Sequence, residues 1–123
     1  MQMIISTSSM VPIYEQIVEN IKRMIMEGEL KNGDILPSVR TLSKELKISA
    51  LTVKKAYDCL EEEGFTATVH GKGTYVKGEN AAMLAEQRRY EIQNELEKIV
   101  KKAEQYGISH EELNQLLQLI IEE

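Results

Sequence analysis

Apolar residues recur at steps of three and four in the first half of the chain, a spacing that predicts amphipathic helices. The first predicted helix runs from Pro12 to Gly28, with apolar positions at Ile13, Ile17, Val18, Ile21, Met24 and Ile25. A second begins at Ser38, with apolar positions at Val39, Leu42 and Leu46. A third runs from Ser49 to about Glu63, with apolar positions at Val53, Ala56, Tyr57 and Leu60. Ser38 and Ser49, at the starts of the second and third helices, can each cap free backbone N–H groups of the first turn.

The period then changes to two, which predicts a β-hairpin. Apolar and polar residues alternate from Phe65 to His70, a turn containing Gly71 and Gly73 follows, and residues 74–76 form a returning strand. Gly64 suits a left-handed end to the preceding helix. The order helix, helix, helix, hairpin over residues 1–77 predicts a winged helix-turn-helix domain, a recurring DNA-reading architecture.

Residues 78–123 predict a second part built from helices. After a linker at 78–80, the span from Ala81 to Tyr106 contains no Gly or Pro, and a capping box at Ser109 opens a last helix. We therefore expect an antiparallel helical pair, which makes the fold class mainly α with a small β-hairpin. A pair this small cannot cover its own apolar faces, so we expect it to dimerise. The candidate dimerisation residues are Ile92, Leu96, Ile99, Leu113, Leu116, Leu117 and Ile120.

Charge is distributed unevenly along the chain. The 15 basic and 20 acidic residues give a net charge of −5, which by itself argues against nucleic-acid binding. Residues 1–77 are neutral, however, and residues 38–55 hold a single acid, Glu45, among the cations Arg40, Lys44, Lys47, Lys54 and Lys55. Such a local basic surface suits phosphate contact, although charge alone fits a solvated helical face equally well.

The residues that carry most enzyme chemistry are sparse. One cysteine, Cys59, and two distant histidines, His70 and His110, offer no metal-ligand spacing, and we expect Cys59 to pack as a small apolar side chain. We find no nucleophile-base pair and no phosphate-binding loop, so we predict neither an enzyme nor a cofactor. The longest apolar-rich stretch, residues 116–121, is too short to span a bilayer, and we predict a cytoplasmic protein without a membrane partner.

Ordered motifs between Leu36 and Val76 resemble the DNA-binding domain of the GntR family of bacterial transcription regulators. They are Leu-Pro-Ser-x-Arg at 36–40, Ser-x-x-Thr-Val at 49–53, Glu-Gly at 63–64 and Gly-x-Gly-Thr-x-Val at 71–76. The resemblance implies a regulator, most simply a homodimeric repressor, that binds an inverted repeat in double-stranded DNA. The alternative is a winged-helix module for protein interaction or assembly that does not read DNA sequence.

The length after Lys77 indicates a branch of the family. The larger branches add domains of well over a hundred residues, which the remaining 46 residues (123 − 77) cannot form. A short two-helix tail resembles the YtrA-like subfamily, whose members dimerise through the tail and commonly regulate ABC-transporter operons. Any small-molecule effector would bind between the two parts or at the dimer interface, and its identity stays open.

The resemblance also implies a set of DNA-contacting positions. They are Ser38, Arg40, Ala50, Leu51, Thr52, Lys54, Lys55, His70, Gly71 and Lys72. Ser38 contacts a phosphate, caps its helix, or does both, and His70 is either a minor-groove contact or a passive turn residue. Many family members carry Arg at the position of Ala50, so a strong guanine reader is missing here. Ala50 and Leu51 can instead touch a thymine methyl group.

Overall fold

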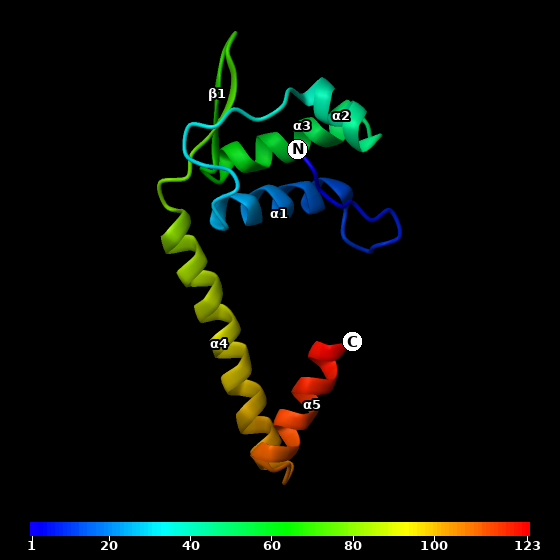
Figure 1. The fold of residues 1–123 in the computed structure, drawn as a ribbon, viewed down its shortest axis with the longest axis vertical. Coiled ribbons are helices and arrows are strands. Elements are labelled where there is room, and N and C mark those ends of the chain that lie inside the picture. Colours follow the sequence, from blue (N-terminus) through cyan, green and yellow to red (C-terminus); the bar gives the residue numbers. More distant parts are fainter. The chain divides into compact units, whose positions relative to one another are not determined.

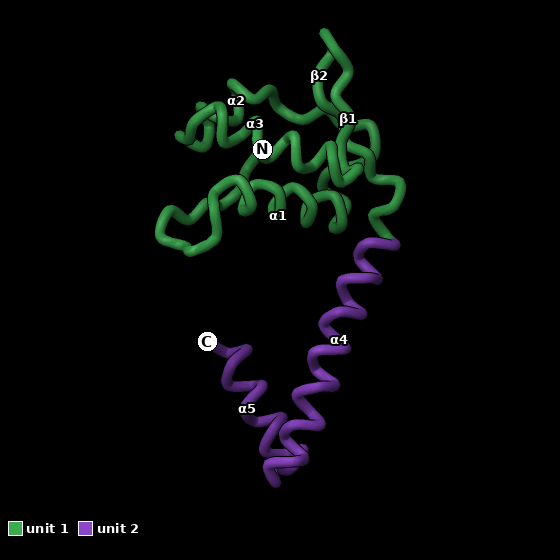
Figure 2. The backbone as a smooth tube through the Cα atoms, turned by 180° about the vertical axis from the view of Figure 1, so that it is seen from behind, with its two compact units in different colours: residues 1–82 green, residues 83–123 purple.

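The computed structural model describes residues 1–123 and divides into two compact units, 1–82 and 83–123 (Figure 2). The first unit contains α1 (Ile13–Met26), α2 (Val39–Leu46), α3 (Ala50–Glu62), β1 (Thr66–Val69) and β2 (Gly73–Val76). The other helices are α4 (Ala81–Gln105), which begins at the end of the first unit, and α5 (His110–Glu122). The predicted winged-helix fold with a helical tail is confirmed.

Local signals in the sequence set the helix ends. The hydroxyl oxygens of Ser38, Ser49 and Ser109 each accept a hydrogen bond from the backbone N–H three residues later, as the capping interpretation predicts. Gly64 follows α3 with φ +86°, the left-handed conformation that glycine adopts at low cost. Lys47 ends α2 with φ +57°, which no feature of the sequence indicated. This left-handed residue turns the chain from α2 into α3.

The core of the first unit lies where its three helices meet. α1 packs along α3, and α2 packs against the other side of α3 (Figure 1). Ile17 and Ile21 of α1, Leu42 of α2, and Val53 and Leu60 of α3 are fully buried there. These are apolar positions that the period of three and four placed on the inner faces, and their burial supplies the main stabilising free energy of the unit.

A third extended segment joins the hairpin. β1 and β2 pair antiparallel with Thr66 opposite Val76 and Val69 opposite Gly73. On the other edge of β2, the Leu36 N–H donates to the Thr74 carbonyl (2.9 Å) and the Val76 N–H donates to the Asp34 carbonyl (2.8 Å). Residues 33–36, between α1 and α2, therefore pair with a strand about forty positions away, which the apolar pattern of the sequence did not predict.

The second unit leaves its apolar residues uncovered. α4 and α5 run in opposite senses from a turn at Gly107 (φ +75°) and diverge from it (Figure 2). Ala103 is the buried residue of α4, and α5 has none. Ile92 is 63% exposed and Ile120 is 67% exposed. No helix of the structure is both long and apolar enough to cross a membrane.

Candidate nucleic-acid interface

The predicted DNA-contacting positions fall in three places in the first unit. They are the first turn of α2, the first turns of α3 and the tip of the hairpin. In Figure 1, α2 and the hairpin lie on one side of α3 and α1 lies on the other. Most of these residues are exposed, so the packed core leaves them available to a partner.

A buried tyrosine fixes α2 to α3. The Tyr57 hydroxyl donates a 2.7 Å hydrogen bond to the Pro37 carbonyl, immediately before the start of α2. Tyr57 is 6% exposed, and burial together with the nearby Glu45 charge raises the pKa of its hydroxyl well above the ordinary value. The hydroxyl therefore stays protonated and keeps its donor role at neutral pH. The sequence predicted Tyr57 as a core residue and did not reveal this contact.

The first turn of α2 presents one free cation. The Ser38 hydroxyl caps the helix by accepting from the Thr41 N–H at 3.1 Å, and it also donates to the Thr41 hydroxyl at 2.9 Å. Arg40, two residues later, is exposed and makes no hydrogen bond or ion pair within the chain. Its guanidinium, with five N–H donors, is available for a base edge or a phosphate.

The start of α3 has polar hydroxyl groups at its N-cap and apolar side chains at its first two positions. The Ser49 and Thr52 hydroxyls hydrogen-bond each other at 2.8 Å, and the Ser49 oxygen also accepts from the Thr52 N–H at 3.1 Å. Ala50 is exposed and Leu51 is 80% exposed. Lys54, one turn on, forms a 2.9 Å ion pair with Asp58. Because both side chains of that pair are more than 60% exposed, it is worth at most about 1 kcal/mol, and a phosphate can replace Asp58.

Lys55 does not join the other predicted contacts. Its ammonium nitrogen lies 4.1 Å from the centroid of the Tyr14 ring, a cation–π contact that turns the side chain toward α1. The sequence placed Lys55 beside Lys54 on the helix and did not indicate that the two cations diverge.

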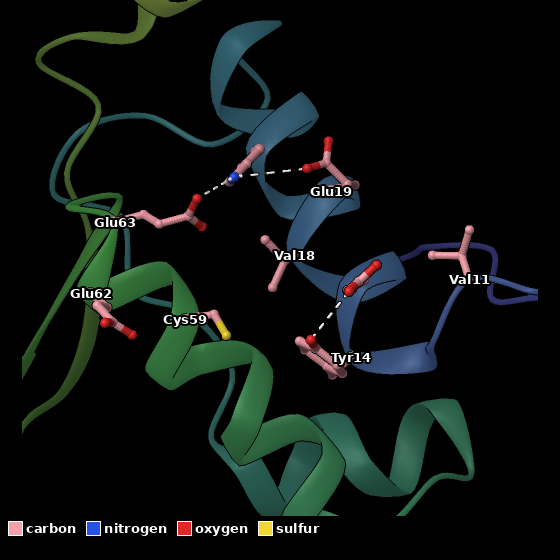
Figure 3. Close-up of a pocket in the computed structure, with 9 residues that line it drawn as sticks. Val11, Tyr14, Val18, Glu19, Cys59, Glu62 and Glu63 are labelled. Carbon is pink, nitrogen blue, oxygen red and sulfur yellow. Dashed lines mark hydrogen bonds and ion pairs between the residues drawn. The ribbon is translucent and has the colours of Figure 1, made fainter.

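A hollow of about 370 Å³ lies between α1 and α3 on this same flank (Figure 3). Cys59 lines it beside Val18 and is partly buried against the core, which agrees with the predicted packing role, and the other lining residues include Glu15, Glu19, Glu62 and Glu63. The ammonium group of Lys22, a largely buried residue, lies 2.9 Å from a carboxylate oxygen of Glu63 and 3.8 Å from one of Glu19. The flank is acidic and would repel phosphate, so the predicted DNA-contacting surface does not extend onto it.

The predicted DNA-contacting residues of the hairpin lie at its tip and are exposed to solvent. His70, Gly71 and Lys72 are exposed, and Gly71 has φ +79°. The hairpin is held to α3 by Glu61, whose carboxylate accepts a 2.9 Å hydrogen bond from the Thr68 N–H. In the sequence Glu61 is one of three consecutive glutamates, and nothing in it indicated this contact. Its role is to position the hairpin relative to α3.

Gly73 lies further down the hairpin. A Cβ atom there would come 3.0 Å from the Ile35 side chain, and its φ of +127° also favours glycine. Gly73 therefore has a packing reason for being glycine. No group of three or more His, Cys, Asp or Glu side chains lies close enough to hold a metal ion.

Comparison with known proteins identifies this arrangement. Residues 13–76 match the model of the bacterial regulatory proteins of the gntR family. The chain belongs to the GntR family. It is 36% identical over 116 residues to the HTH-type transcriptional repressor YtrA of Bacillus subtilis, covering 94% of this chain and 89% of that protein. Members of the family are named as transcriptional regulators rather than enzymes.

Two solved structures extend the comparison. YtrA from Sulfolobus acidocaldarius, a GntR-family transcription factor, is 40% identical with a TM-score of 0.59, covering 74% of this chain and 96% of that one. The DNA-binding domain of AraR in complex with operator ORR3 is 29% identical with a TM-score of 0.53, covering 62% of this chain and 92% of that one. The latter structure shows a similar domain bound to its operator.

Proposed function

We propose that the chain is a homodimeric, sequence-specific DNA-binding transcription repressor. The observation that carries this proposal is that a GntR-family domain exposes cations in the first turns of α2 and α3 and a glycine-containing hairpin tip on the same side of α3 as α2 (Figure 1). In the proposed complex α3 enters the major groove and the hairpin tip lies along the minor groove. Acting on DNA implies a cytoplasmic location in a bacterium.

The contacts divide by chemistry. Arg40 is the strongest candidate for a base contact, because its guanidinium is free and can bind a guanine edge through two hydrogen bonds. Lys54 and Lys72 neutralise phosphates, and the Ser38 and Thr52 hydroxyls supply weaker backbone contacts. Gly71 lets the hairpin tip approach the minor groove closely, with His70 beside it. We assign Lys55 a smaller role, because its ammonium lies over Tyr14.

Dimerisation follows from the uncovered apolar residues of α4 and α5. Besides Ile92 and Ile120, the side chains of Leu96, Ile99, Leu116 and Leu117 are between 42% and 49% exposed, and Leu113 is partly buried. A second copy would bury these residues at the usual gain of about 25 cal/mol per Å² of apolar surface. Two-fold symmetry would then present two domains to half-sites about 34 Å apart or a multiple of that distance.

The structure assigns neither the target genes nor a site for an effector. Resemblance to the YtrA-like subfamily suggests an ABC-transporter operon as the target. A small-molecule effector, if the repressor uses one, has no assigned site. The genes that flank the coding region would test the first of these.

Binding of the full chain to duplex DNA, measured at several salt concentrations, tests the function. The probe is a fluorescent duplex from the region upstream of the chain's own gene, with a shuffled duplex of equal composition as the control. We expect tighter binding to the upstream duplex and an affinity that falls steeply as salt rises, because phosphate contacts release counterions. Absence of binding, or an affinity independent of salt, would refute DNA recognition and favour a protein-interaction module.

A further inference from the structure

α3 exposes one large apolar side chain near its start. Leu51 is 80% exposed in the first turn, beside the exposed Ala50. The inner face of α3 is already complete, with Val53, Ala56 and Leu60 fully buried, so Leu51 has no place in the core. A partner that covers Leu51 would bury apolar surface that the fold itself leaves in water.

The polar groups near Leu51 are already engaged. The Ser49 and Thr52 hydroxyls bond each other and the helix start, and the Lys54 ammonium pairs with Asp58. Ala50 offers only a methyl group, so the first turn of α3 presents to a base pair no side-chain donor or acceptor that is free of an internal contact. The proposed complex assigns the Thr52 hydroxyl and Lys54 to phosphates, which leaves Ala50 and Leu51 as the side chains of this turn that face a base.

The major groove contains one apolar group that such a surface can recognise. Thymine carries a 5-methyl group there, whereas cytosine, adenine and guanine present only hydrogen-bonding atoms and C–H edges. We propose that Leu51 is a specificity residue that packs on the methyl group of a thymine in each half-site. This inference rests on the proposed function, since it requires that α3 enters the major groove.

The test compares thymine with uracil, which pairs identically but lacks the methyl group. A half-site is first obtained by selecting a random duplex library on the full chain. Each thymine of the selected duplex is then replaced singly by deoxyuridine, and the dissociation constant is measured by fluorescence anisotropy. We expect one thymine position at which the change weakens binding about fourfold, and about 16-fold when both half-sites are changed, from the free energy of one buried methyl group.

Variants of the full chain assign the effect to a residue. Leu51→Ala should bind the thymine and uracil duplexes equally well, whereas Leu51→Met should keep the preference for thymine. Arg40→Ala is the matched control, because it should weaken binding to both duplexes by the same factor. The high exposure of Leu51 predicts that neither Leu51 variant changes the thermal unfolding midpoint, which circular dichroism verifies.

The outcomes are separable. If a sequence is selected and bound but no thymine position responds to loss of its methyl, Leu51 does not read thymine, although the DNA-binding function stands. The same conclusion follows if Leu51→Ala keeps the preference. If the library yields no sequence and no duplex is bound, the proposed function fails and this inference fails with it.

Discussion

Replacing Tyr57 by Phe tests the contact that fixes α2 to α3. The substitution removes one oxygen, and with it the 2.7 Å hydrogen bond from the Tyr57 hydroxyl to the Pro37 carbonyl. A hydrogen bond between neutral groups contributes about 0.5 to 1.5 kcal/mol to the free energy of unfolding. At pH 7 we expect Tyr57→Phe to lower that free energy by about 1 kcal/mol, and the unfolding midpoint by about 4 to 8 °C for a domain of this size.

Alkaline pH should reverse this difference. Burial raises the pKa of the Tyr57 hydroxyl in the folded state, whereas in the unfolded chain it ionises near its ordinary pKa of about 10. Above pH 10 the unfolded wild type is therefore stabilised by losing a proton that the folded state retains. The wild type loses about 0.4 kcal/mol by pH 10 and about 1.4 kcal/mol by pH 11 through this group, and the Tyr57→Phe variant, which has no hydroxyl there, loses none. The two stability curves should cross between about pH 10 and 11.

Urea unfolding of both proteins, followed by circular dichroism at pH 7, 9, 10 and 11, measures the effect. Tyr75→Phe is the matched control, because Tyr75 is also partly buried but its hydroxyl makes no hydrogen bond in the structure. We expect the control to match the wild type at pH 7. Equal stability of Tyr57→Phe and the wild type at pH 7, or a difference that stays constant up to pH 11, would refute the assigned contact.

Substitutions at three further places test other parts of the molecule. Leu117→Asp or Ile120→Asp should convert the dimer to a monomer in light scattering while Gln118→Asp should not, and a dimer that survives would refute the proposed interface. Arg40→Ala should weaken specific DNA binding by about 1 to 3 kcal/mol without changing the unfolding midpoint, whereas a lower midpoint at unchanged affinity would make Arg40 structural. Thr66→Val should raise the free energy of unfolding by about 1 kcal/mol or more, because the Thr66 hydroxyl is buried without a partner, and a destabilised variant would show that the hydroxyl is satisfied.

The parts of the fold that the sequence predicted are those set by neighbouring residues. A helix start needs only a serine and an N–H three residues away, so Ser38, Ser49 and Ser109 were recognisable as caps. The pairing of residues 33–36 with β2 joins positions about forty apart, and a short segment with Gly33 and Asp34 has no strand period to reveal it. Long-range pairing of this kind is decided by packing of the whole domain.

The candidate site was predictable in its exposed positions but not in its side-chain partners. Ala50, Leu51 and Lys54, which lie outside the predicted apolar positions of this helix, are exposed on α3. Lys55 also lies outside those positions, but nothing in the sequence indicated that the Tyr14 ring of α1 attracts its ammonium. The anchoring role of Glu61 was hidden for the same reason, since its partner is a backbone N–H of the hairpin. Chemistry that depends on a neighbouring element needs the folded structure.

The net charge of −5 shows why the scale of an electrostatic description matters. At physiological salt a phosphate responds mainly to charges within a Debye length of about 8 Å. The acids of the first unit are largely engaged or turned to the flank, since Glu63 pairs with Lys22 and Glu61 accepts from the hairpin backbone. The cations Arg40 and Lys72 stay exposed. In the proposed complex a duplex would meet these exposed cations, and the excess of acids in residues 78–123, which hold 10 acidic and 5 basic side chains, is screened wherever it lies beyond that distance.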